Sequence, residues 1–451
     1  MLNTPDPDRP VNRDMAGGLG FDRSKSSLLP PLDLLNYAAV LKRKSHDVIL
    51  IDGQAGRFSN DALKTVIAEQ RPDVLVFTAS LPTVDNDIAY AQAIREILPA
   101  NSRLVCKTAV RLQPVVEKIL LESGCDFCII GECDLVIDEI LKRTERMGTA
   151  EILNGQYTIE DEILLEDLDS LPVVDRSLLH NSDYSYFPFG TSVTTMQTSR
   201  GCPFPCGYYC PYPLVQGERW RSMSAERIYT ELFHIINCDK INHVFFRDAT
   251  FTYNQERIRE LCHLIIKNNL QVFWWCETRV NVLSTELLSL MRDAGCRGLN
   301  IGVETGNEEL LSRSAKQGIT LDSVRKISEY CRNNDIILRF LLMIGLPGES
   351  RESLYHTFQL VKSTRPDYIG VTTVTPYPGT LFYEDAVKNN WIKNSDINTF
   401  GGHGYNVEIG SMKSDDLEFA MKKIYEVHRA ITKDEGDARM IEDEFLKWKE
   451  K

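Results

Sequence analysis

The chain has 451 residues, of which 43% are hydrophobic and 25% charged, and its formal net charge is −13 at pH 7. This composition is ordinary for a globular protein of two domains, and no apolar run reaches the roughly 18–20 residues of a membrane span. The negative charge argues against nucleic acid as the main partner, and we expect no membrane partner. The 12 cysteines, in a chain that does not open on a signal peptide, indicate a reducing compartment, so we expect a cytoplasmic protein.

Residues 1–150 alternate between short apolar segments and amphipathic ones. Helical spacing is found at 33–43 and 87–98. Buried strands are predicted by continuous apolar runs at 48–51, 74–77, 104–106 and 127–130. Apolar strands separated by helices are typical of a parallel sheet covered on both faces. We therefore predict a doubly wound, Rossmann-like α/β domain that binds ligands at the carboxyl ends of its strands.

The rest of the chain is predicted to form a linker, a second α/β domain and a helical tail. Residues 151–190 are acidic and then aromatic, and we interpret them as the linker. Residues 191–400 alternate strand and helix patterns again, with a helix at 255–267. Candidate strands lie at 193–197, 243–246, 272–275, 298–301, 338–342 and 368–371. Residues 401–451 hold amphipathic, charge-rich helical sequence from Ser414 onward.

Three cysteines lie within nine residues in the stretch Cys202-Pro-Phe-Pro-Cys206-Gly-Tyr-Tyr-Cys210. Thiolates this close on one loop can reach a single soft metal centre. An iron–sulfur cube takes four such ligands, so three would leave one iron open for a substrate or cofactor. We predict that Cys202, Cys206 and Cys210 are metal ligands; buried structural cysteines are the alternative.

Ser199-Arg-Gly-Cys202 and the cysteines after it resemble the cluster loop of radical S-adenosylmethionine (SAM) enzymes. In that family, the open iron of a [4Fe–4S] cluster binds SAM, and one electron cleaves it to a 5′-deoxyadenosyl radical. The resemblance implies a partial (βα)6 barrel over residues 191–400. It also implies a small-molecule substrate and an external one-electron reductant of the flavodoxin or ferredoxin type.

The cysteine spacing departs from the usual family pattern, which has two residues between the second and third cysteines. Here Gly207, Tyr208 and Tyr209 separate Cys206 from Cys210. Either the loop bulges by one residue or Cys210 is not a ligand, and we favour the bulge. The lengthened spacing is similar to that of the radical diol dehydratases of aminoglycoside pathways.

Two pairs of polar residues resemble SAM-binding segments of the family. Asp248 and Thr250 follow strand 243–246, where the family holds the methionine amine. Glu277 and Arg279 alternate along the next strand and so point to one face, where Arg279 offers a planar fork for a carboxylate. We expect all four to bind the cofactor. A helix cap at Asp248 and a structural Glu–Arg pair are the alternatives.

Two glycine-containing segments further along are similar to later motifs of the family. In Gly302-Val-Glu304 the glutamate resembles the one that meets the ribose or adenine side of SAM. Gly302 permits close backbone approach at this position. Gly345 opens the turn Gly345-Leu-Pro-Gly-Glu349, which resembles a turn after a later barrel strand. We expect Gly302, Glu304 and Gly345 to belong to the cofactor site.

The first domain resembles the cobalamin-binding module that precedes many radical SAM methyltransferases. The resemblance lies in segments 12–21, 30–39, 47–52 and 126–132. Such modules commonly place two glycines after the third strand, against which the nucleotide tail packs. Here Lys107 and Thr108 stand at that place, and their side chains should crowd the tail. We therefore favour a degenerate module that has lost cobalamin, with cobalamin binding as the alternative.

The lengthened spacing and the Lys107-Thr108 departure favour a lyase that dehydrates or deoxygenates a 1,2-diol. The substrate would be a polyhydroxylated, sugar or aminoglycoside-like molecule of antibiotic biosynthesis, with a downstream reductase as a further partner. A general acid must then reach the leaving oxygen, and Tyr208, Tyr209 and Tyr212 are the candidates. The first alternative is a cobalamin-dependent radical SAM methyltransferase of carbon or phosphorus. The second is a non-catalytic protein built on a decayed enzyme.

Overall fold

The computed structural model describes residues 1–6, 11–13, 21–22, 27–55, 58–313, 316 and 318–450. The chain divides into two compact units, one made of Met1–Cys202 and Pro211–Arg247, the other of Pro203–Cys210 and Asp248–Lys451. Most of the glycine-containing segment 12–21, which carries part of the cobalamin-module resemblance, lies outside the described residues. No helix in the described ranges is both long and apolar enough to cross a membrane.

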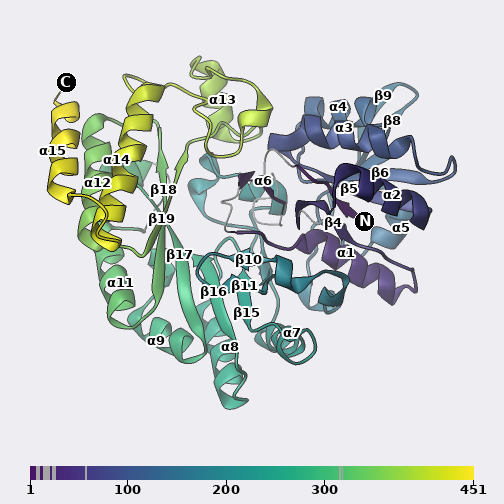
Figure 1. The fold of residues 1–451 in the computed structure, drawn as a ribbon, viewed down its shortest axis with the longest axis horizontal. Coiled ribbons are helices and arrows are strands. Elements are labelled where there is room, and N and C mark those ends of the chain that lie inside the picture. Colours follow the sequence, from purple (N-terminus) through teal and green to yellow (C-terminus); the bar gives the residue numbers. More distant parts are fainter. Residues whose placement is uncertain are drawn as a thin grey trace. The chain divides into compact units, whose positions relative to one another are not determined.

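A seven-stranded sheet in the order β4-β1-β5-β6-β7-β8-β9 forms the centre of the first unit (Figure 1). Its strands are β1 (Leu2–Asn3), β4 (Ile51–Asp52), β5 (Val74–Ala79), β6 (Arg103–Thr108), β7 (Phe127–Ile130), β8 (Thr149–Leu153) and β9 (Gln156–Ile159). Its helices are α1 (Leu32–Arg43), α2 (Asn60–Gln70), α3 (Val84–Arg95), α4 (Gln113–Glu122) and α5 (Ile137–Leu141). A separate pair, β2 (Val11–Asn12) and β3 (Phe21–Asp22), lies outside this sheet.

The parallel core of this sheet confirms the predicted Rossmann-like fold. Strands β4, β1, β5, β6 and β7 pair in parallel. Phe77, Val105 and Phe127 are fully buried on them, as expected where helices cover both faces. The predicted strand 48–51 is shifted and shortened to β4, because its partner β1 is itself only two residues long.

Strands β8 and β9 form an antiparallel hairpin that the sequence analysis did not predict. Residues of this stretch were assigned to the linker because they are polar, and β9 is mostly exposed. The turn at Asn154-Gly155 has φ values of 51° and 76°, the left-handed conformation of two-residue hairpin turns. That dipeptide was the local signal for the hairpin.

The second α/β domain is a curled parallel half-barrel, as predicted, with strand order β12-β15-β16-β17-β18-β19. The strands are β12 (Val193–Met196), β15 (His243–Phe246), β16 (Phe273–Thr278), β17 (Cys296–Glu304), β18 (Ile337–Ile344) and β19 (Tyr368–Thr373). The helices are α7 (Ala225–Asn237), α8 (Gln255–Lys267), α9 (Thr285–Asp293), α10 (Glu308–Arg313), α11 (Leu321–Asn333) and α12 (Arg351–Thr364). The predicted helix 255–267 coincides with α8.

Local sequence explains where these helices begin. Side-chain oxygens of the N-cap residues accept backbone N–H bonds that would otherwise lack a partner. The N-caps of this kind are Ser224, Asn254, Ser284, Thr320 and Ser350. These caps fix where the helices start, so the loops between strand ends and helices can carry functional residues.

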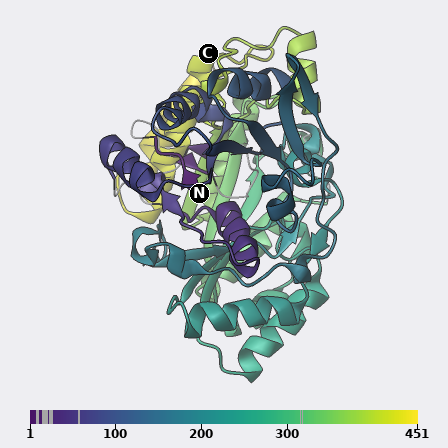
Figure 2. The ribbon, with the colours of Figure 1, turned by 90° about the vertical axis from the view of Figure 1, so that its right-hand side faces the viewer.

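The tail is helical, as predicted. It contains α13 (Leu381–Lys388), α14 (Ser414–Thr432) and α15 (Ala438–Lys449). Both ribbon views show the yellow C-terminal helices close to strand β19, which α14 contacts (Figure 1, Figure 2). The Arg351 guanidinium of α12 binds Asp416 of α14 at 2.8 Å, and the fully buried Phe445 of α15 packs on Phe358.

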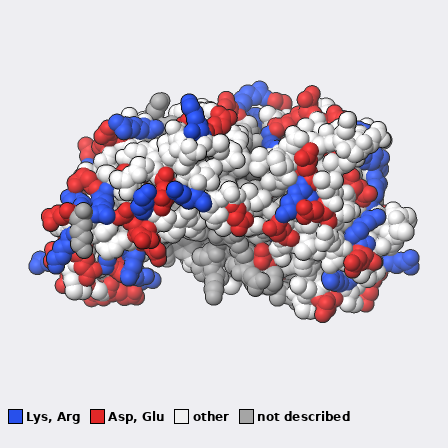
Figure 3. All heavy atoms as spheres, turned by 90° about the horizontal axis from the view of Figure 1, so that it is seen from above, with Lys and Arg blue, Asp and Glu red and all other residues white. Residues whose placement is uncertain are grey.

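Acidic and basic side chains are interspersed on the face that Figure 3 shows. Among the described residues of this face, no continuous basic stripe follows the surface. This distribution agrees with a chain that has 51 basic and 64 acidic residues.

Candidate functional site

The cluster loop begins in a short antiparallel pair, β13 (Ser199–Arg200) with β14 (Arg221–Ser222). Gly201 follows with a φ of +83°, and a side chain there would lie 2.1 Å from the Arg219 carbonyl oxygen. The backbone N–H of Cys202 then donates to the Gly217 oxygen at 3.1 Å. Only glycine can make this turn, so the backbone of the first cysteine is held by the β13–β14 pair.

The second and third cysteines lie one helical turn apart. Residues Pro205–Tyr208 form a 3₁₀ turn, and the Cys210 N–H donates to the Cys206 oxygen at 3.0 Å. Residues at this spacing are neighbours on a helical turn, so the extra residue is absorbed without separating the two thiols widely. Cys202 and Cys206 are 7% exposed and Cys210 is half-buried; none of the three is in a disulfide.

The three thiols have the donor chemistry of an iron–sulfur cluster. Within the described ranges, however, no three Cys, His, Asp or Glu side chains converge in a group that would hold a metal ion. The assignment of Cys202, Cys206 and Cys210 as ligands therefore stays a prediction.

Arg279 lies against the cluster loop. Its Nη1 donates to Cys206 Sγ at 3.6 Å, and its guanidinium carbon lies 3.9 Å from the centre of the Phe204 ring. Nε donates to Asn281 Oδ1 at 3.2 Å, and the residue is 4% exposed. The structure thus brings Arg279 to a cysteine of the predicted cluster, a contact that the sequence did not indicate.

Glu304 forms a buried ion pair with Lys316, whose Nζ lies 2.7 Å from Glu304 Oε1. Burial alone would lower the pKa of Lys316, but the charge of Glu304 outweighs it, so the pKa is raised and the ammonium stays charged. Glu304 itself has a φ of +64°, an uncommon left-handed conformation. Lys316 was missed because nothing in its local sequence marks it.

Gly302 makes room for this ion pair. A side chain at Gly302 would lie 2.8 Å from Lys316 Nζ and 3.1 Å from Glu304 Oε1. The predicted cofactor residues Gly302 and Glu304 therefore belong to one buried arrangement at the end of β17.

The remaining predicted cofactor residues of the second unit lie near the ends of their strands. Asp248 and Thr250 are buried, and the Phe251 N–H donates to the Glu277 carbonyl oxygen at 2.9 Å. Glu277 Oε1 accepts from Asn300 Nδ2 at 3.2 Å, so Asn300 holds the Glu277 side chain.

Gly345 makes the turn after β18 with a φ of +87°. Its N–H donates to the buried carboxylate of Glu349. Burial raises the pKa of Glu349 to about 8, against the smaller lowering effect of the backbone N–H groups of Gly345 and Leu346.

The tyrosines proposed as acids have different surroundings. Tyr208 OH donates to Asp385 of α13 at 2.8 Å, while Tyr209 is 5% exposed and its hydroxyl has no hydrogen-bond partner among the described residues. Both line a cavity of about 290 Å³ beside the turn at Leu346 and Pro347. Tyr212 opens the short helix α6 (Tyr212–Gln216) instead.

The first unit has a pocket at the carboxyl ends of β5, β6 and β7, where a Rossmann-like sheet binds ligands. It is small, about 40 Å³, and its lining includes Tyr37, Ser80, Lys107, Thr108, Arg111 and Gly131. Tyr37 OH and Arg111 Nε are buried there without a hydrogen-bond partner within the described ranges. Burial raises the pKa of Tyr37 well above its usual value, so the hydroxyl remains a donor. Unsatisfied buried donors fit a polar ligand.

Comparison with known proteins locates the second domain within a superfamily. Residues 196–361 match the family model of the radical SAM superfamily. An uncharacterized methyltransferase of Pyrococcus horikoshii is 29% identical over 376 residues, 80% of this chain and 79% of that protein. The anaerobic magnesium-protoporphyrin IX monomethyl ester cyclase of Rubrivivax gelatinosus is 24% identical over 406 residues, 86% of this chain and 71% of that protein.

One solved structure with the same fold is that of the radical SAM methyltransferase TsrM of Kitasatospora setae, with cobalamin and a [4Fe–4S] cluster bound. The TM-score is 0.67 at 16% identity, over 82% of this chain and 77% of that one. At this identity the likeness establishes the fold.

These comparisons overturn one expectation. Diol dehydration by a lyase is wrong, because relatives that match most of the chain are named as methyltransferases and a cyclase. The expectation rested on Lys107-Thr108 and on one extra residue between Cys206 and Cys210, which the loop absorbs in a single turn. The acid role of Tyr208, Tyr209 and Tyr212 was argued for that reaction and stays untested. The fold gives no support to the favoured loss of cobalamin, because a structure that shares it has cobalamin bound.

Proposed function

Because the chain is a radical SAM enzyme whose barrel follows a Rossmann-like domain, we propose that it is a cobalamin-dependent methyltransferase. It would move a methyl group from SAM to an unactivated carbon or a phosphinate phosphorus of a small molecule. The observation that carries the proposal is the polar pocket at the carboxyl ends of β5, β6 and β7. The names of relatives covering most of the chain support it.

The pocket fits cobalamin in chemistry. Cobalamin presents amide groups and a phosphate, which would accept hydrogen bonds from Tyr37 OH and Arg111 Nε. Lys107 Nζ instead has a weak contact of its own, 3.4 Å from the Gly131 oxygen. Lys107 and Thr108 also narrow the pocket, and a nucleotide tail requires both side chains to swing aside.

The cysteine loop and the strand ends of the barrel would hold the other cofactors. Cys202, Cys206 and Cys210 would bind the cluster. Arg279 donates a hydrogen bond to Cys206 Sγ. Glu304, held in place by Lys316, would accept the ribose hydroxyls of SAM. When bound, the cluster supplies the electron that cleaves SAM, and cobalamin supplies a carrier for the methyl group. The electron would come from a flavodoxin- or ferredoxin-type reductant.

Corrinoid retention tests the proposal. Protein reconstituted with iron, sulfide and hydroxocobalamin should keep corrinoid through desalting, and Tyr37→Phe combined with Arg111→Met should lose most of it. Tyr90→Phe is the matched control, because Tyr90 OH is bonded to Asn60 in the same unit and does not line the pocket. Protein that binds iron but keeps no corrinoid would contradict the proposal.

A further inference from the structure

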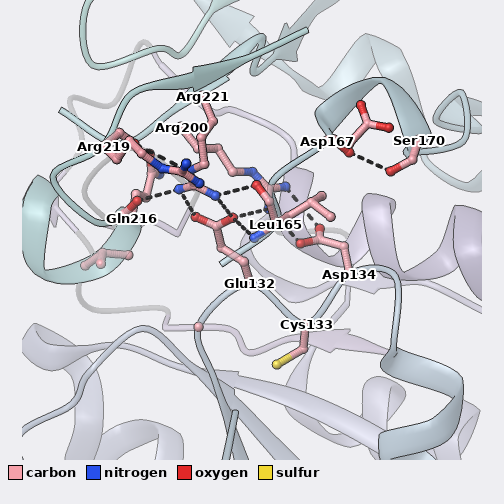
Figure 4. A network of polar contacts seen from close by, with 12 residues as sticks. Glu132, Cys133, Asp134, Leu165, Asp167, Ser170, Arg200, Gln216, Arg219 and Arg221 are labelled. Carbon is pink, nitrogen blue, oxygen red and sulfur yellow. Dashed lines mark hydrogen bonds and ion pairs between the residues drawn. The ribbon is translucent and has the colours of Figure 1, made fainter. Parts of the chain in front are cut away.

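Four buried charges join the ligand end of the N-terminal sheet to the start of the cluster loop (Figure 4). Glu132 and Asp134 follow β7, and Arg200 and Arg221 lie on β13 and β14. We call these four residues the latch. Their side chains are between 2% and 4% exposed, and all four belong to the first unit.

Both arginines bind carboxylates with two hydrogen bonds each. Arg200 donates to Asp134 at 2.7 and 3.1 Å. Arg221 donates to Glu132 at 2.7 and 2.8 Å. Such paired contacts fix orientation as well as distance. Burial alone would raise the pKa of Asp134, but Arg200 outweighs it and lowers the pKa, so the carboxylate stays ionised.

Glu132 is needed because the two arginines oppose each other. Arg200 and Arg221 are direct partners in the β13–β14 ladder. Like charges in directly opposed positions destabilise a strand pair. Glu132 accepts from both, with Arg200 Nη1 at 3.3 Å, and so removes the repulsion. Without the carboxylates, the strand pair that leads into the cluster loop would be repelled apart.

The latch is connected directly to the first cysteine. Arg200 precedes Cys202 by two residues. Gly201 lies between them, and a side chain at this position would clash with the backbone. The Cys202 N–H donates to the Gly217 oxygen, while Arg221 donates to the Gln216 oxygen at 2.6 Å. Arg221 therefore fixes the segment Gln216-Gly217, whose Gly217 oxygen accepts the Cys202 N–H.

We propose that the latch positions Cys202, so that the N-terminal domain sets the geometry of the cluster loop. Glu132 and Asp134 also line the pocket at the carboxyl ends of the sheet, so a ligand there rests against the same carboxylates. The inference rests on the cysteine loop and does not require methyl transfer.

Hydrogen exchange of the iron-free protein tests the latch. In Asp134→Asn and Glu132→Gln, peptides spanning 198–223 should exchange at least about tenfold faster, because an unpaired buried arginine opens the strand pair. Glu151→Gln is the matched control, since Glu151 is also buried and paired with two arginines, Arg143 and Arg146. Exchange in Asp134→Asn within twofold of wild type would overturn the proposal.

A second pair of variants separates positioning from stability. Asp134→Asn with Arg200→Gln leaves no unpaired charge, so it should restore the thermal midpoint. The two hydrogen bonds between positions 200 and 134 stay lost, so exchange should remain faster than in wild type. Arg200→Lys keeps the charge but not the paired contact, so its exchange rate should lie between those of wild type and Asp134→Asn. After reconstitution, the electron paramagnetic resonance spectrum of the reduced cluster should differ from wild type in the double variant. Wild-type exchange and spectrum in the double variant would overturn the proposal.

Discussion

Gly302 illustrates how one missing side chain shapes the proposed SAM site. Gly302→Ala places a methyl group 2.8 Å from Lys316 Nζ, the flexible end of a long side chain that can move away. We expect the variant to fold with nearly wild-type stability but to bind SAM roughly tenfold more weakly, about 1.4 kcal/mol, because the Glu304–Lys316 pair is displaced. Equilibrium dialysis with labelled SAM measures this.

Gly306→Ala is the contrasting control. Its methyl group would lie 2.3 Å from the His356 carbonyl oxygen, and this backbone atom cannot move away without distorting the chain. This variant should lose about 1–3 kcal/mol of unfolding free energy in urea. Unchanged SAM affinity in Gly302→Ala would show that the ion pair does not shape the site.

Glu349 should make stability depend on pH. Its pKa is raised from 4.5 to about 8, so between these values the folded state keeps a proton that the unfolded state releases. The unfolding free energy should therefore fall as pH rises through this window, by up to about 1.4 kcal/mol per pH unit. Glu349→Gln carries no such proton. Urea unfolding at pH 5.5 and 8 should show a smaller fall for the variant than for wild type; equal falls would contradict the assignment.

At the scale of elements, the contact between the end of β16 and the cluster loop should tune the cluster. Hydrogen bonds and positive charge near a ligand sulfur favour the reduced cluster. Removing the Arg279 contact to Cys206 Sγ in Arg279→Gln should lower the reduction potential by roughly 60 mV, tenfold in the ratio of reduced to oxidised cluster. A spectroscopic redox titration measures it, with Arg279→Lys as the charge-retaining control. An unchanged reduction potential in Arg279→Gln would show that Arg279 does not tune the cluster.

The end of β6 should limit corrinoid binding. Lys107 and Thr108 narrow the pocket, so Lys107→Gly with Thr108→Gly should increase the corrinoid that the reconstituted protein retains. Glycines also weaken a strand end, so thermal unfolding must confirm that the variant is folded. Reduced retention in a folded variant would show that these side chains bind the ligand instead of crowding it.

Elements were predictable where the signal is local. Continuous apolar runs located β5, β6 and β7 to within a few residues. The alternation of strand and helix segments located the barrel strands. The β8–β9 hairpin was missed because its polar residues resemble a linker, although Asn154-Gly155 marked the turn. Contacts between distant residues were out of reach: Arg200 and Asp134 are 66 positions apart, and no local pattern pairs them.

At the scale of the whole molecule, the proposed methyl transfer depends on the N-terminal domain. Three features of this domain lie at the carboxyl ends of one sheet: the pocket, the unsatisfied donors of Tyr37 and Arg111, and the latch. Each unpaired buried donor costs about 1–3 kcal/mol, which a bound polar ligand would offset.

The most direct test of methyl transfer follows the methyl group of SAM. Reconstituted protein with retained corrinoid is given reductant and SAM deuterated on its methyl group, and the products are quantified by mass spectrometry. We expect S-adenosylhomocysteine in amounts equal to the retained corrinoid, with the deuterated methyl group held by the protein-bound corrinoid. Consumption of SAM to 5′-deoxyadenosine alone, with no S-adenosylhomocysteine formed by the corrinoid-loaded protein, would contradict methyl transfer.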